Sequence, residues 1–136
     1  MTKTVSIDDL GLNAVADSDT PQPMTVFRAD GQSTVLKLHV LGKFATAVEK
    51  SNAKFYQKFQ KQAEMEKRKG SKVSSLTYED AKREDLEATM ARVVGWEGVS
   101  QEYTEDGLRK LLTDNPHIKT DVVDFSDELT NFTKTA

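Results

Sequence analysis

One uninterrupted stretch, residues 43–69, constrains the fold more than any other part of the sequence. It contains neither proline nor glycine, and apolar side chains recur at the spacing of one helix face. These side chains are Phe44, Val48, Phe55, Phe59 and Ala63. A helix of this length spans about 40 Å at 1.5 Å per residue. That is longer than the width of so small a domain, so we expect part of the helix to project.

The aromatic residues of this stretch have two interpretations. They are candidates for the hydrophobic core, and on a projecting helix they are also candidates for a protein-binding surface. Flanking lysines keep such a surface compatible with water and attract acidic partners. The predicted partner-binding residues, to which the hairpin preceding the helix is added, are Phe44, Lys50, Lys54, Phe55, Lys58 and Phe59.

The N-terminal part of the sequence divides into a tail and a hairpin. Residues 1–23 are rich in polar residues and proline, so we predict a disordered tail. Residues 24–41 contain two apolar runs around Asp30-Gly31, a pair that suits a tight β-hairpin turn. Because a hairpin is marginal alone, it must pack on helices or join another sheet. We therefore predict one helical domain with a β-hairpin over residues 24–136.

Helix-capping signals predict three further helices. Thr77 and Asp80 resemble a capping box at the start of a helix over residues 78–95. Thr104 caps a short helix, and Asn115-Pro116 begins another. That last helix carries an apolar seam at helical spacing, formed by Ile118, Val122, Phe125, Leu129 and Phe132. The predicted fold class is mainly α, with a small N-terminal β-hairpin followed by about four helices, one of them long.

A turn is predicted after the helix over residues 78–95, formed by Gly95, Trp96 and Gly98. Within it, the Trp96 ring is expected to fill the core, where its indole N–H needs a hydrogen-bond partner. The alternative is an exposed tryptophan that contacts a partner protein.

Charge is distributed unevenly along the chain. The whole sequence has a net charge of −3, but residues 43–72 carry 9 basic and 3 acidic side chains, and residues 73–136 carry 7 basic and 14 acidic ones. Opposite charges favour attraction within a chain or between copies, so a homo-oligomer is one expectation. Nucleic-acid binders are more often basic overall, so the basic run over residues 67–72 indicates helix capping rather than nucleic-acid contact.

The sequence shows no pattern for catalysis, metal binding or membrane insertion. It contains no cysteine, and its two histidines, His39 and His117, stand outside metal-binding motifs. It has no glycine-rich phosphate loop, no nucleophile elbow, no secretory signal and no apolar run of about 18 residues. We therefore predict a cytoplasmic protein that is not an enzyme and that takes no cofactor, metal or membrane partner.

An ordered set of short segments carries a resemblance to a known family. The segments are residues 40–44, 91–99, 103–106, 108–112, 115–118 and 125–132. They resemble a strand leading into a long helix, a Gly-Trp turn, two capped helix starts and an amphipathic C-terminal helix. In this order they are similar to the tail assembly chaperones of long-tailed bacteriophages, over about residues 24–133.

The resemblance implies a function and partners. Such chaperones bind the tape measure protein before the tail tube forms around it, and many have a frameshifted longer form that recruits tail tube protein. On this basis we expect both proteins as partners, action in the host cytoplasm and absence from the mature virion. The alternatives are a structural head–tail or tail completion protein and a nucleic-acid-binding regulator.

Overall fold

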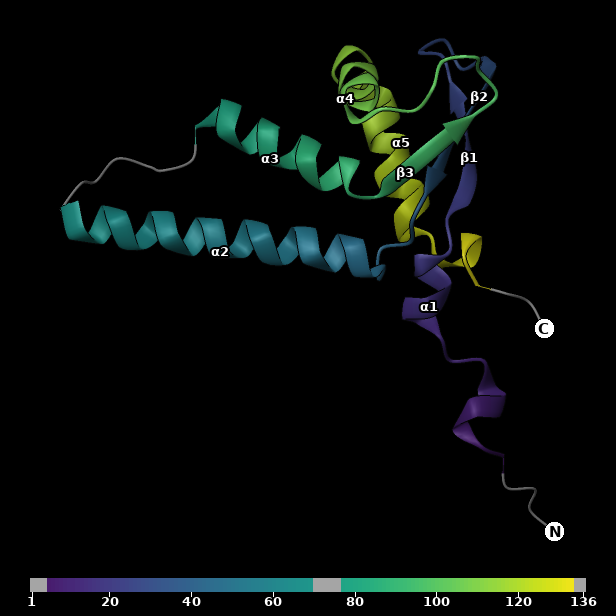
Figure 1. Ribbon diagram of the computed structural model, residues 1–136, viewed down its shortest axis with the longest axis horizontal. Helices are drawn as coiled ribbons and strands as arrows, with labels where there is room; N and C mark the ends of the chain where they lie inside the picture. Colours follow the sequence, from purple (N-terminus) through teal and green to yellow (C-terminus); the bar gives the residue numbers. More distant parts are fainter. Residues whose placement is uncertain (1–4, 70–76, 134–136) are drawn as a thin grey trace.

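The computed structural model describes residues 5–69 and 77–133 (Figure 1). It is mostly helical with one three-stranded antiparallel sheet, so the predicted fold class is confirmed. In chain order the elements are η1 (Ile7–Leu10), α1 (Ala14–Asp19), β1 (Gln22–Phe27), β2 (Ser33–Val40), α2 (Thr46–Lys69), α3 (Tyr78–Met90), β3 (Val93–Glu97), α4 (Glu105–Asp114), α5 (Pro116–Asp127) and η2 (Leu129–Asn131). The tail end over residues 1–4 and the connection over residues 70–76 lie outside the described residues.

The strands β1 and β2 form the predicted hairpin. In its turn Gly31 has a φ of 90°, which glycine adopts without strain. The Asp30 carboxylate accepts a hydrogen bond from the backbone N–H of Gln32 at 3.1 Å. Alternate side chains of both strands face the core, where Met24 lies opposite Leu38 and both are buried. The hairpin therefore has one apolar face that other elements must cover.

The sheet has a third strand, β3, in a region where the sequence predicted a helix. The helix α3 ends at Met90, not at residue 95, and β3 pairs antiparallel with β2. Val93 and Val94 are β-branched and so fit a strand better than a helix. The pairing with β2 also places Val93 in the core.

The predicted glycine-tryptophan turn is wrong in part. Gly95 and Trp96 are strand residues that pair with β2. Gly98 follows the strand and makes the turn, with a φ of 91°. A Cβ atom at this position would lie 1.9 Å from the carbonyl oxygen of Val35. Glycine is therefore required here both by the backbone conformation and by the space.

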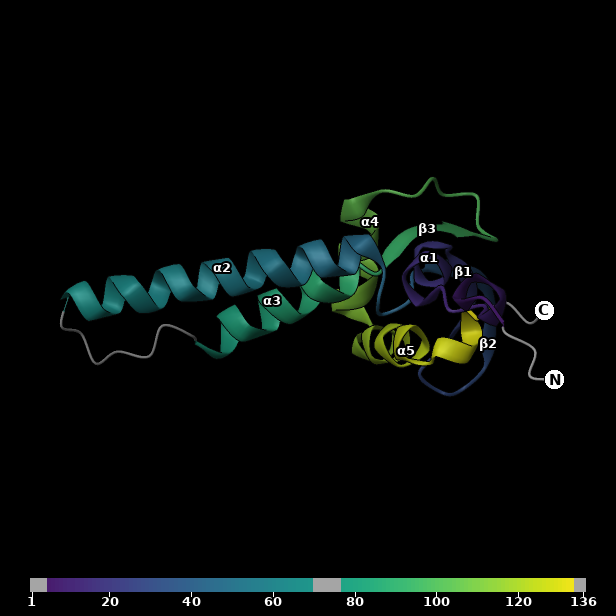
Figure 2. The same cartoon turned by 90° about the horizontal axis from the view of Figure 1, so that it is seen from below.

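The core lies between the sheet and the helices α4 and α5, with the end of α3 beside them (Figures 1 and 2). The helix starts are as predicted: the Thr104 side chain accepts a hydrogen bond from Gly107 N–H at 3.0 Å, and Pro116 is the first residue of α5. Apolar side chains from all six of these elements form the core cluster: Met24, Val26, Leu38, Val40, Met90, Val93, Leu108, Leu112, Ile118 and Val122.

The C-terminal apolar series is divided between two short helices, so the prediction of one continuous helix from Pro116 through Phe132 is wrong. The helix α5 ends at Asp127, and Glu128 adopts an extended conformation before η2. This break returns the chain toward the core. Phe132 is 3% exposed and packs edge-on against Phe125, with 5.6 Å between the ring centroids.

The prediction of a disordered tail is corrected for residues 14–23. Ser18 of α1 is buried, and its carbonyl oxygen accepts a hydrogen bond from Gly42 N–H at 2.9 Å. The Asp19 carboxylate accepts one from Thr46 N–H at 2.7 Å and so caps the start of α2. The first strand begins at Gln22, two residues before the predicted start. Contacts with the base of α2, which are remote in sequence, order this segment.

The helices α2 and α3 form an arm that projects from the sheet (Figures 1 and 2). The 24 residues of α2 span about 36 Å, and α3 returns beside them. At the base of the arm Val48 is buried with Leu41 and Ala45. Beyond Val48 none of the described α2 side chains is buried. The long helix therefore projects, as its length predicts.

Candidate partner-binding groove

A groove of about 840 Å³ lies between α2 and α3 where the arm joins the sheet. Its apolar lining comes from α2, α3, β3 and α4 and consists of Ala47, Phe55, Ala81, Ala88, Ala91, Met90, Val93 and Leu108. Three of these residues, Met90, Val93 and Leu108, also belong to the core cluster. The groove thus leads from the core out to solvent along the arm.

Four of the six predicted partner-binding residues line this groove. They are Lys50, Lys54, Phe55 and Lys58. Phe59 lies one turn further along α2, with its ring centroid 6.4 Å from that of Phe55. Both phenylalanines line a smaller pocket against α3, and both remain more than two-fifths exposed. These five residues therefore form one continuous surface on the arm.

Phe44 is not part of this surface. It precedes α2, is 43% exposed, and has the ammonium group of Lys43 at 5.4 Å from its ring centroid. The hairpin, which was predicted to share the surface, contributes no residue to the groove lining. The structure therefore limits the candidate site to the arm and its junction with the sheet.

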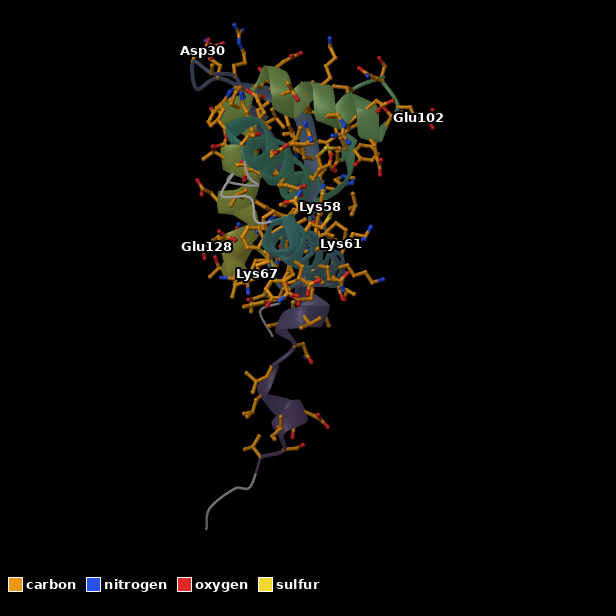
Figure 3. The ribbon with its side chains drawn as sticks, turned by 90° about the vertical axis from the view of Figure 1, so that its left-hand side faces the viewer. Asp30, Lys58, Lys61, Lys67, Glu102 and Glu128 are labelled. Carbon is orange, nitrogen blue, oxygen red and sulfur yellow. The ribbon has the colours of Figure 1, made fainter. Side chains whose placement is uncertain are left out.

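Lysines lie on more than one side of α2. Figure 3, seen from the free end of the arm, shows Lys58 and Lys61 on neighbouring sides of the helix and Lys67 on another. Lys58 donates to the Glu84 carboxylate of α3 at 2.7 Å and so ties the two helices together. Among the described residues, no carboxylate lies within 4.0 Å of the ammonium groups of Lys50 or Lys54. Their charge is therefore available at the groove.

The acidic residues of α3 contribute to the groove in a way that the sequence did not indicate. Asp80 pairs with Arg83 of its own helix at 3.5 Å. The other pairs cross between elements: Glu84 with Lys58, Glu87 with Arg109 of α4, and Asp85 with Lys119 of α5. The three α3 carboxylates that line the groove are thus each paired with a cation, whereas the Glu105 carboxylate of α4 also lines it and has no cation within 4.0 Å among the described residues. On the α2 side the charge of the lining comes from lysines alone.

An aromatic pair supports the inner end of the groove. Tyr103 lines the groove and packs edge-on against Trp96, with 5.1 Å between the ring centroids. The Trp96 N–H donates to the Gln101 carbonyl oxygen at 2.8 Å, so the predicted need for a partner is met. Burial raises the pKa of the Tyr103 hydroxyl above its ordinary value, and the nearby Glu105 carboxylate adds to this effect. The hydroxyl therefore stays protonated and neutral at physiological pH.

The histidines lie away from the groove. His39 Nε2 is 3.1 Å from the Glu97 carboxylate on the neighbouring strand, and His117 Nε2 is 2.8 Å from the Phe27 carbonyl oxygen. Within residues 5–69 and 77–133, histidine and carboxylate side chains form no group of three or more that could hold a metal ion. In the same ranges no helix is both long enough and apolar enough to cross a membrane.

No protein-family model, no curated protein and no solved structure matches this chain.

Proposed function

We propose that this chain is a tail assembly chaperone that holds apolar helical segments of a tape measure protein in the α2–α3 groove. The groove itself is the observation that supports this most. It is about 840 Å³ in volume, is apolar where it meets the core, and lies on an arm that extends from the sheet. An amphipathic helix can bury its apolar face in such a groove while its polar face remains in solvent.

A tape measure client has the chemistry that this surface accommodates. Before the tube encloses it, such a client exposes long apolar segments that aggregate when free. A partner that binds these segments competes with aggregation by mass action. Action in the host cytoplasm, absence from the mature virion and recruitment of tail tube subunits belong to the same proposal, and they rest on the segment resemblance.

The unpaired charges favour a particular kind of client helix. Lys50 and Lys54 stand beside the apolar lining on the α2 side. They attract helices that carry acidic residues along the edge of an apolar stripe, and they disfavour basic ones. The phenylalanine at position 55 supplies the largest exposed apolar contact in the groove lining.

Substitution of Phe55 by serine is expected to abolish client solubilisation while the fold is retained. The test is co-expression of this chain with a tape measure protein, followed by measurement of the soluble fraction of the client. Loss of one aromatic anchor weakens binding about 10- to 30-fold, so the client should be about as insoluble as it is alone. Circular dichroism of each variant reports whether the helices are intact.

The adjacent Tyr56 provides a matched control. It is 61% exposed, also lies on α2, and does not line the groove. Tyr56→Ser should therefore solubilise the client as the unchanged chain does. Client solubility that is the same with and without this chain contradicts the chaperone function. A stable ring retained in the virion would instead favour the structural alternative, and DNA binding with steep salt dependence would favour the regulator.

A further inference from the structure

The N-terminal segment, residues 5–15, exposes an apolar and acidic surface. Its five large apolar side chains are each more than half exposed: Val5, Ile7, Leu10, Leu12 and Val15. Its charged groups are two carboxylates, Asp8 and Asp9. Its hydrogen bonds among described residues are local, such as Asp9 N–H to the Ser6 carbonyl oxygen at 3.0 Å. Such a segment is suited to a partner surface that is both apolar and basic.

We propose that this segment of one copy binds the α2–α3 groove of a second copy. The groove offers apolar side chains, among them Phe55, next to the ammonium groups of Lys50 and Lys54, which have no carboxylate partner among the described residues. The short helix η1 places Ile7 and Leu10 three residues apart, so the two lie on one face. The carboxylates of Asp8 and Asp9 then lie beside that face, where the lysines of the groove can pair with them.

The fold directs the segment away from the groove of its own chain. The Ser18 carbonyl oxygen accepts a hydrogen bond from Gly42 N–H, and the Asp19 carboxylate accepts one from Thr46 N–H. The N-terminal segment therefore begins at the base of α2. Figure 1 shows α3 on one side of α2 and the N-terminal segment leading away on the other side. The helix α2 therefore stands between the segment and its own groove, whereas the groove of a second copy is open to it.

Occupation by a second copy has two consequences. If each copy inserts its segment into the other, the pair closes as a symmetric dimer, and if it does not close, a head-to-tail chain results. In either case the segment covers the groove when no client is present. The inference concerns the same groove as the proposed function, but its test needs no client.

The test is sedimentation velocity of the full chain at low salt, from about 1 to 100 μM. The mass is expected to rise above the 15.2 kDa of one chain as concentration increases. The double change Lys50→Glu with Lys54→Glu should weaken association about tenfold, and Asp8→Lys with Asp9→Lys should do the same. Lys110→Glu, at a side chain that is 81% exposed on α4, should have no effect.

Mixing the two double variants should restore association between them. The groove of the Lys50→Glu, Lys54→Glu variant is acidic, and it can bind the basic segment of the Asp8→Lys, Asp9→Lys variant. A chain that is monomeric at every concentration overturns the inference, and so does association that neither double variant weakens.

Because the sequence has no cysteine, Leu10→Cys and Phe55→Cys can also be combined in one chain. A disulfide that forms within single chains at high dilution would overturn binding to a second copy. The Asp8 and Asp9 variants should still solubilise the client, so failure here is separable from failure of the proposed function.

Discussion

Replacing Gly98 with alanine is expected to lower the melting temperature by more than about 10 °C. The φ of 91° at this position costs any side chain about 1–3 kcal/mol. In addition, the new Cβ would lie 1.9 Å from the carbonyl oxygen of Val35 in β2. The strand β2 is paired on both sides, so it cannot move aside without disturbing the whole sheet. Thermal unfolding followed by circular dichroism measures the change.

The matched control is Gly31→Ala in the hairpin turn. Gly31 has nearly the same conformation, with a φ of 90°, but no atom lies within 4 Å of the position its Cβ would take. This variant should lose only the conformational cost, about 1–3 kcal/mol. If both variants lowered the melting temperature by the same small amount, the turn after β3 would not lie as close to β2 as the structure shows.

Replacing Leu108 with alanine is expected to lower the free energy of unfolding by about 3–4 kcal/mol. Leu108 is 0% exposed, and its side chain belongs both to the core and to the lining of the groove. Truncation removes apolar contacts and leaves a cavity that the surrounding sheet and helices cannot fully close. Urea unfolding at equilibrium measures the loss.

The same substitution at Leu10 provides the comparison. Leu10 is 56% exposed in the N-terminal segment, so Leu10→Ala should change the free energy of unfolding by no more than about 0.5 kcal/mol. If Leu108→Ala unfolds at the same urea concentration as the unchanged chain, then α4 does not pack on the core as described.

Features that depend on nearby residues were predictable from the sequence. The capping box is present as expected: the Thr77 side chain accepts a hydrogen bond from Asp80 N–H at 3.1 Å. Thr104 and Pro116 begin helices for equally local reasons. The long helix followed from its periodicity and from the absence of breaking residues.

Features that depend on distant residues were not predictable in this way. Val93 and Val94 continue an apolar pattern that suits a helix, but pairing with β2, which lies more than 50 positions earlier, makes them a strand. The break at Glu128 similarly returns Phe132 to the core. In each case burial against a remote element outweighed a local preference.

The candidate site was predictable only on one of its sides. The lysines and phenylalanines of α2 were visible as a pattern along a single helix. The groove, however, arises from the position of α3 and α4, and nothing in the periodicity of α2 specifies that position. The Lys58–Glu84 pair and the place of Tyr103 in the lining are likewise consequences of tertiary structure.

The most direct test of the proposed function is hydrogen–deuterium exchange of this chain with and without a tape measure segment. If the groove holds the client helix, amide exchange should slow over residues 47–58 of α2 and 81–90 of α3, the ranges that contain its lining residues on these two helices. The Phe55→Ser variant should lose that protection, and Tyr56→Ser should keep it. Protection confined to the hairpin, residues 22–40, with unchanged exchange in the arm, would contradict the proposal.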